Sequence, residues 1–216
     1  MKSLVQPKYI LGVMFAVLAI FLAAKTFCWK CPLSSVPQKL ENSQPVYGSI
    51  PPFSLTKQDG EKFSLSDLKG KVWIADFIFT RCAGACPLMS NKMRALEDKL
   101  ADAGNIRLVS FIVDPDHDTP EVLARYSERF KTDPKRWVFL TGDRNAVFQL
   151  AEQHFHLGVA QIPAEEREAA DQTVRHSSKF VLVDQKAQIR GYYDSDSEGS
   201  MQKLVDDARA LVSPMR

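Results

Sequence analysis

One stretch, residues 72–90, constrains the fold of this chain more than any other. It opens with an apolar run that only Asp76 interrupts. A short run rich in aromatic and β-branched residues predicts a strand that is buried on both faces. A tight loop with Cys82 and Cys86 follows, and Pro87 suits the first position of a helix because the N–H that it lacks has no intrahelical partner there. The partial positive charge of that helix N-terminus favours the thiolate forms of both cysteines.

Strand-like and helix-like segments alternate along the rest of the chain. The predicted strands are residues 53–56, 62–65, 107–113, 137–140, 179–184 and 189–193. Further helices are predicted from Pro120 with Thr119 as N-cap, over residues 145–156 with Gly158 closing them, and over residues 200–212, while residues 161–175 form a charged loop. We therefore predict an α/β fold with a mostly parallel sheet and helices on both faces. Cysteines on the turn after a central strand are typical of the thioredoxin pattern.

The N-terminal region has a different character from the rest. Residues 9–24 carry no charge, and the span can reach bilayer length if Lys25 snorkels. The expected organisation is a cytoplasmic N-terminus (1–8), a transmembrane anchor (9–29), an extended linker (30–46) and a thioredoxin-like domain (47–216). Lys2 and Lys8 favour a cytoplasmic N-terminus, so we expect a single-pass protein of the bacterial inner membrane with its domain in the periplasm. The alternative is a signal peptide that is cleaved after Ala24.

Charge and cysteine content narrow the possible functions. The 216 residues include 28 Lys and Arg against 26 Asp and Glu, and no basic stripe with interleaved aromatics occurs, which argues against nucleic-acid binding. Cys28 and Cys31 form a C-x-x-C pair around Trp29-Lys30. Such a pair can hold a disulfide or a soft metal in an oxidising compartment. The alternative is two interfacial cysteines beside a tryptophan at the headgroup level.

The second cysteine pair has the spacing C-x-x-x-C instead of the C-x-x-C of thioredoxins. The added residue widens the loop and lets both sulfurs turn toward one ion, so the rest of the chain has to supply a third ligand. His176 is the favoured candidate, because it starts a predicted hairpin strand at the end of a loop that can carry it over the cysteines. His117 lies on the same rim, whereas His154 and His156 point to different faces of one helix.

Three motifs, in this order, resemble those of the SCO/SenC family. They are F-x-F-T-x-C-x-x-x-C-P (residues 77–87), V-D-P-x-x-D-T-P (residues 113–120) and H-S at His176. Members of this family are membrane-anchored, thioredoxin-like copper proteins that assist the assembly of cytochrome c oxidase. The resemblance covers roughly residues 48–212 and includes the N-terminal anchor.

The resemblance implies a metal site and a partner. It makes Cys82, Cys86 and His176 the ligands of copper, bound as Cu(I) and as Cu(II), and it places Asp114 beside the site. Two thiolates and one imidazole suit Cu(I), while zinc in a structural site would require a fourth ligand. The implied partner is the oxidase subunit that carries the binuclear copper site, and other periplasmic copper or thiol carriers are further candidates.

Several positions depart from the family pattern or stay open. Ala83 replaces the usual proline, Arg175 stands where an acid is frequent, and His117 stands where a basic residue is usual. The last two alter the charge near the metal. Asp76 lies six residues before Cys82, where thioredoxins carry a buried acid that handles protons. We expect it either to be buried without a partner, which would raise its pKa, or to pair with a lysine at the sheet edge.

Three classes of function therefore compete. The first is copper binding, with delivery of copper to the oxidase site or reduction of that site's cysteines. The second is a metal-independent thiol–disulfide oxidoreductase that uses Cys82 and Cys86. The third is a thiol peroxidase, for which Arg81 is the only nearby activating arginine. His176 separates the first class from the others, because disulfide exchange has no evident need of a histidine there.

Overall fold

The structure is a computed structural model that describes residues 45–167 and 173–212. Its main feature is an eight-stranded sheet. Its strands follow the order β1 (Gly48–Ser49), β10 (Gln188–Asp194), β9 (Lys179–Val183), β4 (Val72–Ile78), β5 (Ile106–Ile112), β6 (Trp137–Thr141), β2 (Ser54–Lys57) and β3 (Lys62–Ser64). β4, β5 and β6 run parallel at the centre of the sheet, and the outer strands pair antiparallel. The prediction of a mostly parallel sheet is therefore correct only for the centre, because two hairpins extend both edges.

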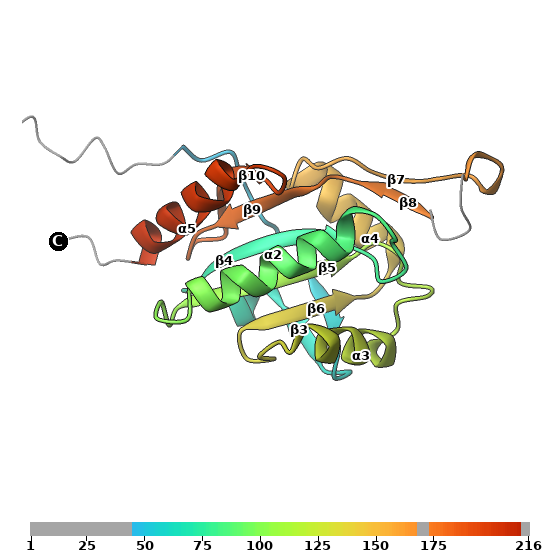
Figure 1. Cartoon of the computed structure of the whole chain (residues 1–216), viewed down its shortest axis with the longest axis horizontal. Helices are drawn as coiled ribbons and strands as arrows, with labels where there is room; N and C mark the ends of the chain where they lie inside the picture. The colour runs from blue at the N-terminus through green and yellow to red at the C-terminus, as the bar shows by residue number, and fades with distance from the viewer. Residues whose placement is uncertain (1–44, 168–172, 213–216) are drawn as a thin grey trace, which may run out of the picture. The chain divides into compact units, whose positions relative to one another are not determined.

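Four α-helices accompany this sheet in the described part of the chain. They are α2 (Ala85–Lys99), α3 (Pro120–Phe130), α4 (Arg144–Gln149) and α5 (Glu198–Val212). A π-helix (Leu150–His154) continues α4. The described residues also contain two 3₁₀ turns, Leu65–Leu68 and Ala164–Glu166. α2 contacts both of its neighbours, since Ser90 hydrogen-bonds to Tyr126 of α3 and Arg209 of α5 donates to the Lys99 carbonyl. Figure 1 shows α2 and α5 lying across the same side of the sheet.

The two central strands form the core on which the cysteine loop is built. All seven residues of β4 are buried, as the apolar run predicts. Phe77 stacks on Phe111 of β5 with ring centroids 5.0 Å apart, and Phe155 meets the edge of Phe77 at 5.1 Å. Burial of each such ring stabilises the fold by roughly 1.5–3 kcal/mol. The end of β4, where the cysteine loop begins, is thus fixed by the densest part of the molecule.

Two predicted helix boundaries are wrong. α2 begins at Ala85, so Pro87 is its third residue and Cys86 lies inside the first turn. Proline is tolerated there because none of the first four N–H groups has an intrahelical partner. The helix predicted over residues 145–156 begins at Arg144 and continues as a π-helix that ends at His154. The chain then turns at His156, whose φ is +52°, before Gly158 is reached.

The segment predicted as a charged loop at residues 161–175 contains regular structure instead. β7 (Val159–Gln161) and β8 (Val174–His176) form a separate antiparallel ribbon, which projects from the main sheet in Figure 1. His176 ends β8 and does not start the hairpin strand β9, which begins at Lys179. Sequence periodicity misses strands of three residues, because a period of two cannot be read over so short a run.

The predicted anchor and linker fall largely outside the described residues, as do Cys28 and Cys31. The described residues belong to one unit, Gln44–Arg216. Among the helices of residues 45–167 and 173–212, none has the length and apolar character needed to cross a membrane.

Candidate metal centre

Three side chains that lie far apart in the sequence converge at the end of β4. The sulfurs of Cys82 and Cys86 and a ring nitrogen of His176 all lie within 4.8 Å of one another. Cys82 is half-buried in the loop after β4, and Cys86 is fully buried in the first turn of α2. His176 arrives from β8, 90 residues after Cys86. Within the described residues, these three form the only cluster of His, Cys, Asp or Glu groups that can hold a metal ion.

The histidine ring is oriented by the backbone beside it. Its Nδ1 lies 3.0 Å from the Ser177 carbonyl oxygen, which can only accept, so Nδ1 carries the proton. Nε2 is therefore free of a proton in the neutral ring and faces the Cys86 sulfur at 3.0 Å. Phe79 packs edge-on against the ring, with centroids 5.7 Å apart. Metal-binding histidines almost always have this arrangement, in which one nitrogen is anchored and the other is available.

The two thiols differ strongly in acidity. A hydrogen bond from the Cys86 thiol lowers the pKa of Cys82 to about 3, with smaller help from backbone N–H groups, while partial burial acts in the opposite direction. The same hydrogen bond, together with burial, raises the pKa of Cys86 far above that of a free thiol. At neutral pH the pair is thus one thiolate, the accessible Cys82, and one buried thiol that keeps its proton. This supports the expectation of thiolate character for Cys82 and not for Cys86.

Asp76 lies in the middle of β4, where it is fully buried. Neither of its carboxylate oxygens has an ion pair or a hydrogen bond of regular geometry among the described residues, so the alternative of a lysine partner is wrong. Burial raises the pKa of Asp76 to about 7, while the Ser110 hydroxyl and the His176 ring act in the opposite direction. Ser110 is its register partner on β5 and also accepts the Trp137 indole N–H at 2.9 Å.

Asp114 lies beside the centre through its partners. Its carboxylate accepts hydrogen bonds from Arg81 at 2.6 Å and from the Thr173 hydroxyl at 3.0 Å, and Arg144 approaches to 3.5 Å. Arg81 is thereby ion-paired, and this arrangement gives the thiol peroxidase alternative no support. Nothing in the sequence marks Thr173 or Arg144 as part of this group, because both reach it only through folding.

His117 is not one of the three converging groups. Its Nδ1 lies 2.8 Å from Asp118, a fully buried carboxylate that also accepts the backbone N–H of Thr80 at 2.8 Å and the Thr80 hydroxyl. Asp118 therefore fixes the residue two positions before Cys82. It belongs to the V-D-P-x-x-D-T-P motif, and that membership is the one sequence signal that marks it.

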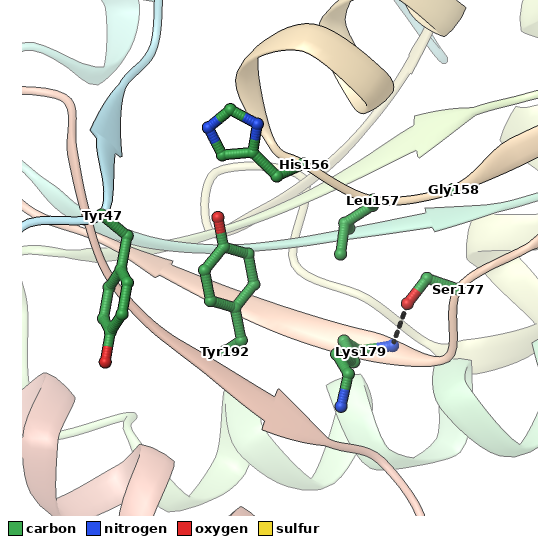
Figure 2. A pocket seen from close by; sticks show the side chains of 7 residues that line it. All are labelled: Tyr47, His156, Leu157, Gly158, Ser177, Lys179 and Tyr192. Atoms are coloured by element: carbon green, nitrogen blue, oxygen red, sulfur yellow. Dashed lines mark hydrogen bonds between the residues drawn. The ribbon is translucent and has the colours of Figure 1, made fainter.

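An open cavity of about 440 Å³ is lined by Ser177, the residue after His176. None of the three converging side chains lines it. Figure 2 shows its lining, in which Tyr47 and Tyr192 face His156 and the segment from Ser177 to Lys179. Ser177 connects the two places, because its carbonyl oxygen accepts the Nδ1 proton of His176.

The fold and the converging side chains define a thioredoxin-like protein with a Cys-Cys-His cluster that can hold a metal ion. A family model described as SCO1/SenC matches residues 42–213. The chain belongs to the SCO1/SenC family.

Curated relatives and solved structures agree with this assignment. The chain is 33% identical to the SCO1 protein homolog of Bacillus subtilis over 167 residues. The aligned residues cover 77% of this chain and 84% of the relative. A SCO1/SenC family lipoprotein from Bacillus anthracis superposes with a TM-score of 0.71 at 31% identity, over 79% of this chain and 99% of that one. BsSco, a member of the Sco family of cytochrome c oxidase assembly proteins with a disulfide switch, gives 0.67 at 29% identity, over 79% and 97%.

Proposed function

We propose that this protein binds copper through Cys82, Cys86 and His176 and serves the assembly of cytochrome c oxidase. The observation that carries the proposal is the convergence of two sulfurs and one imidazole nitrogen within 4.8 Å. Two soft sulfur donors suit Cu(I), and the added imidazole suits Cu(II) as well. Copper is the cargo here, and the residues that hold it belong to the end of β4, the first turn of α2 and the end of β8.

Relatives of known structure support copper as the metal. ScoI of Arabidopsis thaliana has been solved with copper bound, and it superposes with a TM-score of 0.60 at 26% identity, over 74% of this chain and 98% of that one. The membership of BsSco in the Sco family of oxidase assembly proteins supports the oxidase as the destination. We infer that the acceptor is the subunit with the binuclear copper site, with periplasmic copper or thiol carriers as further partners.

The same reasoning extends to the cell location. The uncharged run at residues 9–24 and the linker that follows it fit a single-pass anchor in the bacterial inner membrane, with the domain in the periplasm. A domain tethered in this way has a raised effective concentration for an acceptor in the same membrane.

A second function, reduction of the acceptor's cysteines, is favoured by the asymmetry of the two thiols. The half-buried Cys82 thiolate can attack an acceptor disulfide, which forms a mixed disulfide and releases one acceptor thiolate. Cys86 then gives its proton to the His176 Nε2, which lies 3.0 Å from its sulfur, and attacks the Cys82 sulfur, which releases the second acceptor thiolate. Two electrons pass to the acceptor, and Cys82 and Cys86 end as a disulfide.

A copper titration tests the proposal. The reduced full-length protein in detergent, with Cys28 and Cys31 changed to Ser, should bind one copper per chain in competition with a Cu(I) chelator. X-ray absorption should count two sulfur ligands and, for Cu(II), at least one nitrogen ligand. Binding that disappears with Cys28→Ser and Cys31→Ser, or that survives loss of Cys82 and Cys86, would show that this assignment is wrong.

Delivery of copper and reduction of the acceptor's cysteines can be distinguished by the redox state in which the acceptor is supplied. Copper-loaded protein mixed with an acceptor subunit whose cysteines are already reduced should transfer copper if delivery is the function. Copper-free reduced protein mixed with an oxidised acceptor should yield the Cys82–Cys86 disulfide if reduction is the function. Quantitative thiol counting on the separated proteins distinguishes the two.

A further inference from the structure

One buried carboxylate touches both segments that carry the candidate copper ligands. Asp114 is 3% exposed, and its Oδ2 accepts a hydrogen bond from the Arg81 guanidinium at 2.6 Å and another from the Thr173 hydroxyl at 3.0 Å. Arg81 immediately precedes Cys82. Thr173 lies three residues before His176. A single oxygen atom thus joins the cysteine loop to the strand that carries the histidine.

The strand that carries the histidine pairs with one short strand, and Val174 is its residue in the hydrophobic core. β7 and β8 contribute three residues each to a two-stranded ribbon, and such a ribbon is marginally stable by itself in water. The Ile162 N–H donates to the Thr173 carbonyl at 3.0 Å, so Thr173 continues the ladder of this ribbon. A tie at Thr173 is therefore transmitted along a paired strand to His176.

The carboxylate at the centre of this link is itself anchored. Arg144 lies 3.5 Å from the other oxygen of Asp114 and 2.5 Å from the exposed Asp116. Asp114 therefore keeps a cationic neighbour when either Arg81 or Thr173 is changed. The two contacts on Oδ2 can be removed one at a time without leaving a buried charge that lacks any partner.

We propose that Arg81, Asp114 and Thr173 form a bridge that positions His176 against the cysteine pair. These are positioning residues, since none of their side chains belongs to the converging ligand group. The inference rests on the proposed copper binding. It follows that breaking the bridge loosens the imidazole and leaves the two sulfurs in place. Because Cu(I) is held mainly by the sulfurs and Cu(II) needs the imidazole more, the bridge should act chiefly on Cu(II).

A double-mutant cycle in the full-length protein tests the bridge. Thr173→Val removes the hydroxyl and keeps the shape, and Arg81→Met removes the charge. Each should weaken Cu(II) binding by about tenfold and Cu(I) binding by less than about threefold, with reduced nitrogen hyperfine coupling in the Cu(II) spectrum. The double variant should lose no more than the weaker-binding single variant, because one broken link already opens the bridge.

Two variants make the result specific. Thr173→Ser retains a hydroxyl and should restore Cu(II) binding to within about twofold of the parent. Thr56→Val removes a hydroxyl from β2, whose partner is Lys62, and should change neither affinity. Parental Cu(II) binding by Thr173→Val, equal losses for both oxidation states, or losses that multiply in the double variant would overturn the bridge. A parent protein that binds no copper would overturn the proposed function instead, and the same cycle on the free energy of unfolding would then show whether Arg81 and Thr173 are coupled at all.

Discussion

The cysteine side and the histidine side of the centre are built on very different supports. The cysteines follow β4, whose seven residues are all buried and which pairs along its whole length with β5. Cys86 itself sits in the first turn of the 15-residue helix α2. The histidine ends the three-residue strand β8, which pairs with β7 alone among the described strands. The position of the Cys86 sulfur is thus set by the core, whereas the imidazole depends on the Ser177 carbonyl, on the edge of Phe79 and on a short ribbon.

Under the proposed copper binding, this difference would let one site serve two oxidation states of copper. Sulfur donors next to the core would provide a constant site for Cu(I). An imidazole on a two-stranded ribbon would add a ligand that matters most for Cu(II) and that can be withdrawn at low cost. Copper release would then begin on the histidine side. The predictions below test each side in turn, from the largest expected effect to the smallest.

Substitution of the buried Cys86 on the cysteine side should abolish tight Cu(I) binding. Cys86→Ser takes away one of two sulfur donors and leaves a hydroxyl, which is a poor ligand for Cu(I). We expect Cu(I) affinity to fall by more than about 10⁴-fold, which corresponds to more than about 5 kcal/mol. Competition with a Cu(I) chelator measures this, and Cys28→Ser is the matched control. Retention of affinity within tenfold would contradict a site built on both sulfurs.

The buried acid beneath the cysteines should make the rigid side sensitive to pH. The pKa of Asp76 is about 7 in the folded protein against an ordinary value of 3.8, so between these pH values the folded state binds more protons than the unfolded state. The contribution of Asp76 to stability therefore falls as pH rises from about 4 to about 7. Asp76→Asn should equal the parent near pH 4 and exceed it at pH 8, by on the order of 4 kcal/mol at most.

Denaturant unfolding at several pH values checks this sign. Asp184→Asn is the control, because that buried carboxylate is paired with Arg190 at 3.1 Å and its loss should destabilise the protein at pH 8. A stability difference between the parent and Asp76→Asn that does not change with pH would mean that Asp76 does not titrate in this range.

Loss of the histidine should affect the adjustable side selectively. His176→Ala should weaken Cu(II) binding by about 100-fold and Cu(I) binding by about tenfold or less, because the imidazole contributes more to the harder ion. Parallel titrations with Cu(I) and Cu(II) give both values. His154→Ala, near the end of the π-helix, is the control. Equal losses of affinity for Cu(I) and Cu(II) would contradict the distinction between the cysteine side and the histidine side.

The smallest effect is expected for the pH dependence of Cys82. Because the pKa of Cys82 is about 3, its thiolate population is nearly constant above pH 5. The alkylation rate of Cys82 in reduced, copper-free protein should change by less than about twofold between pH 5 and pH 8, whereas the rate of an ordinary thiol rises by about 10³-fold. Mass spectrometry of the labelled cysteine follows the rate. Cys86→Ala removes the hydrogen bond and should restore a steep pH dependence.

The sequence by itself determined the elements whose signals are local. The apolar run before the cysteines predicted β4, and Thr119 followed by Pro120 predicted the start of α3, because burial and capping depend on neighbouring residues. The three motifs indicated the family, and that resemblance implied Cys82, Cys86 and His176 as copper ligands.

Tertiary structure alone decided what lies around those ligands. His176 reaches Cys86 from a strand too short to leave a periodic pattern, and Thr173 meets Asp114 across 59 residues. The state of Asp76 was open until its neighbours were known, since a carboxylate has the same letter in the sequence whether it pairs with a lysine or is buried among uncharged groups. Local patterns determine which elements form, but pKa values, the proton position on His176 and the support of the ribbon depend on contacts that exist only after the chain has folded.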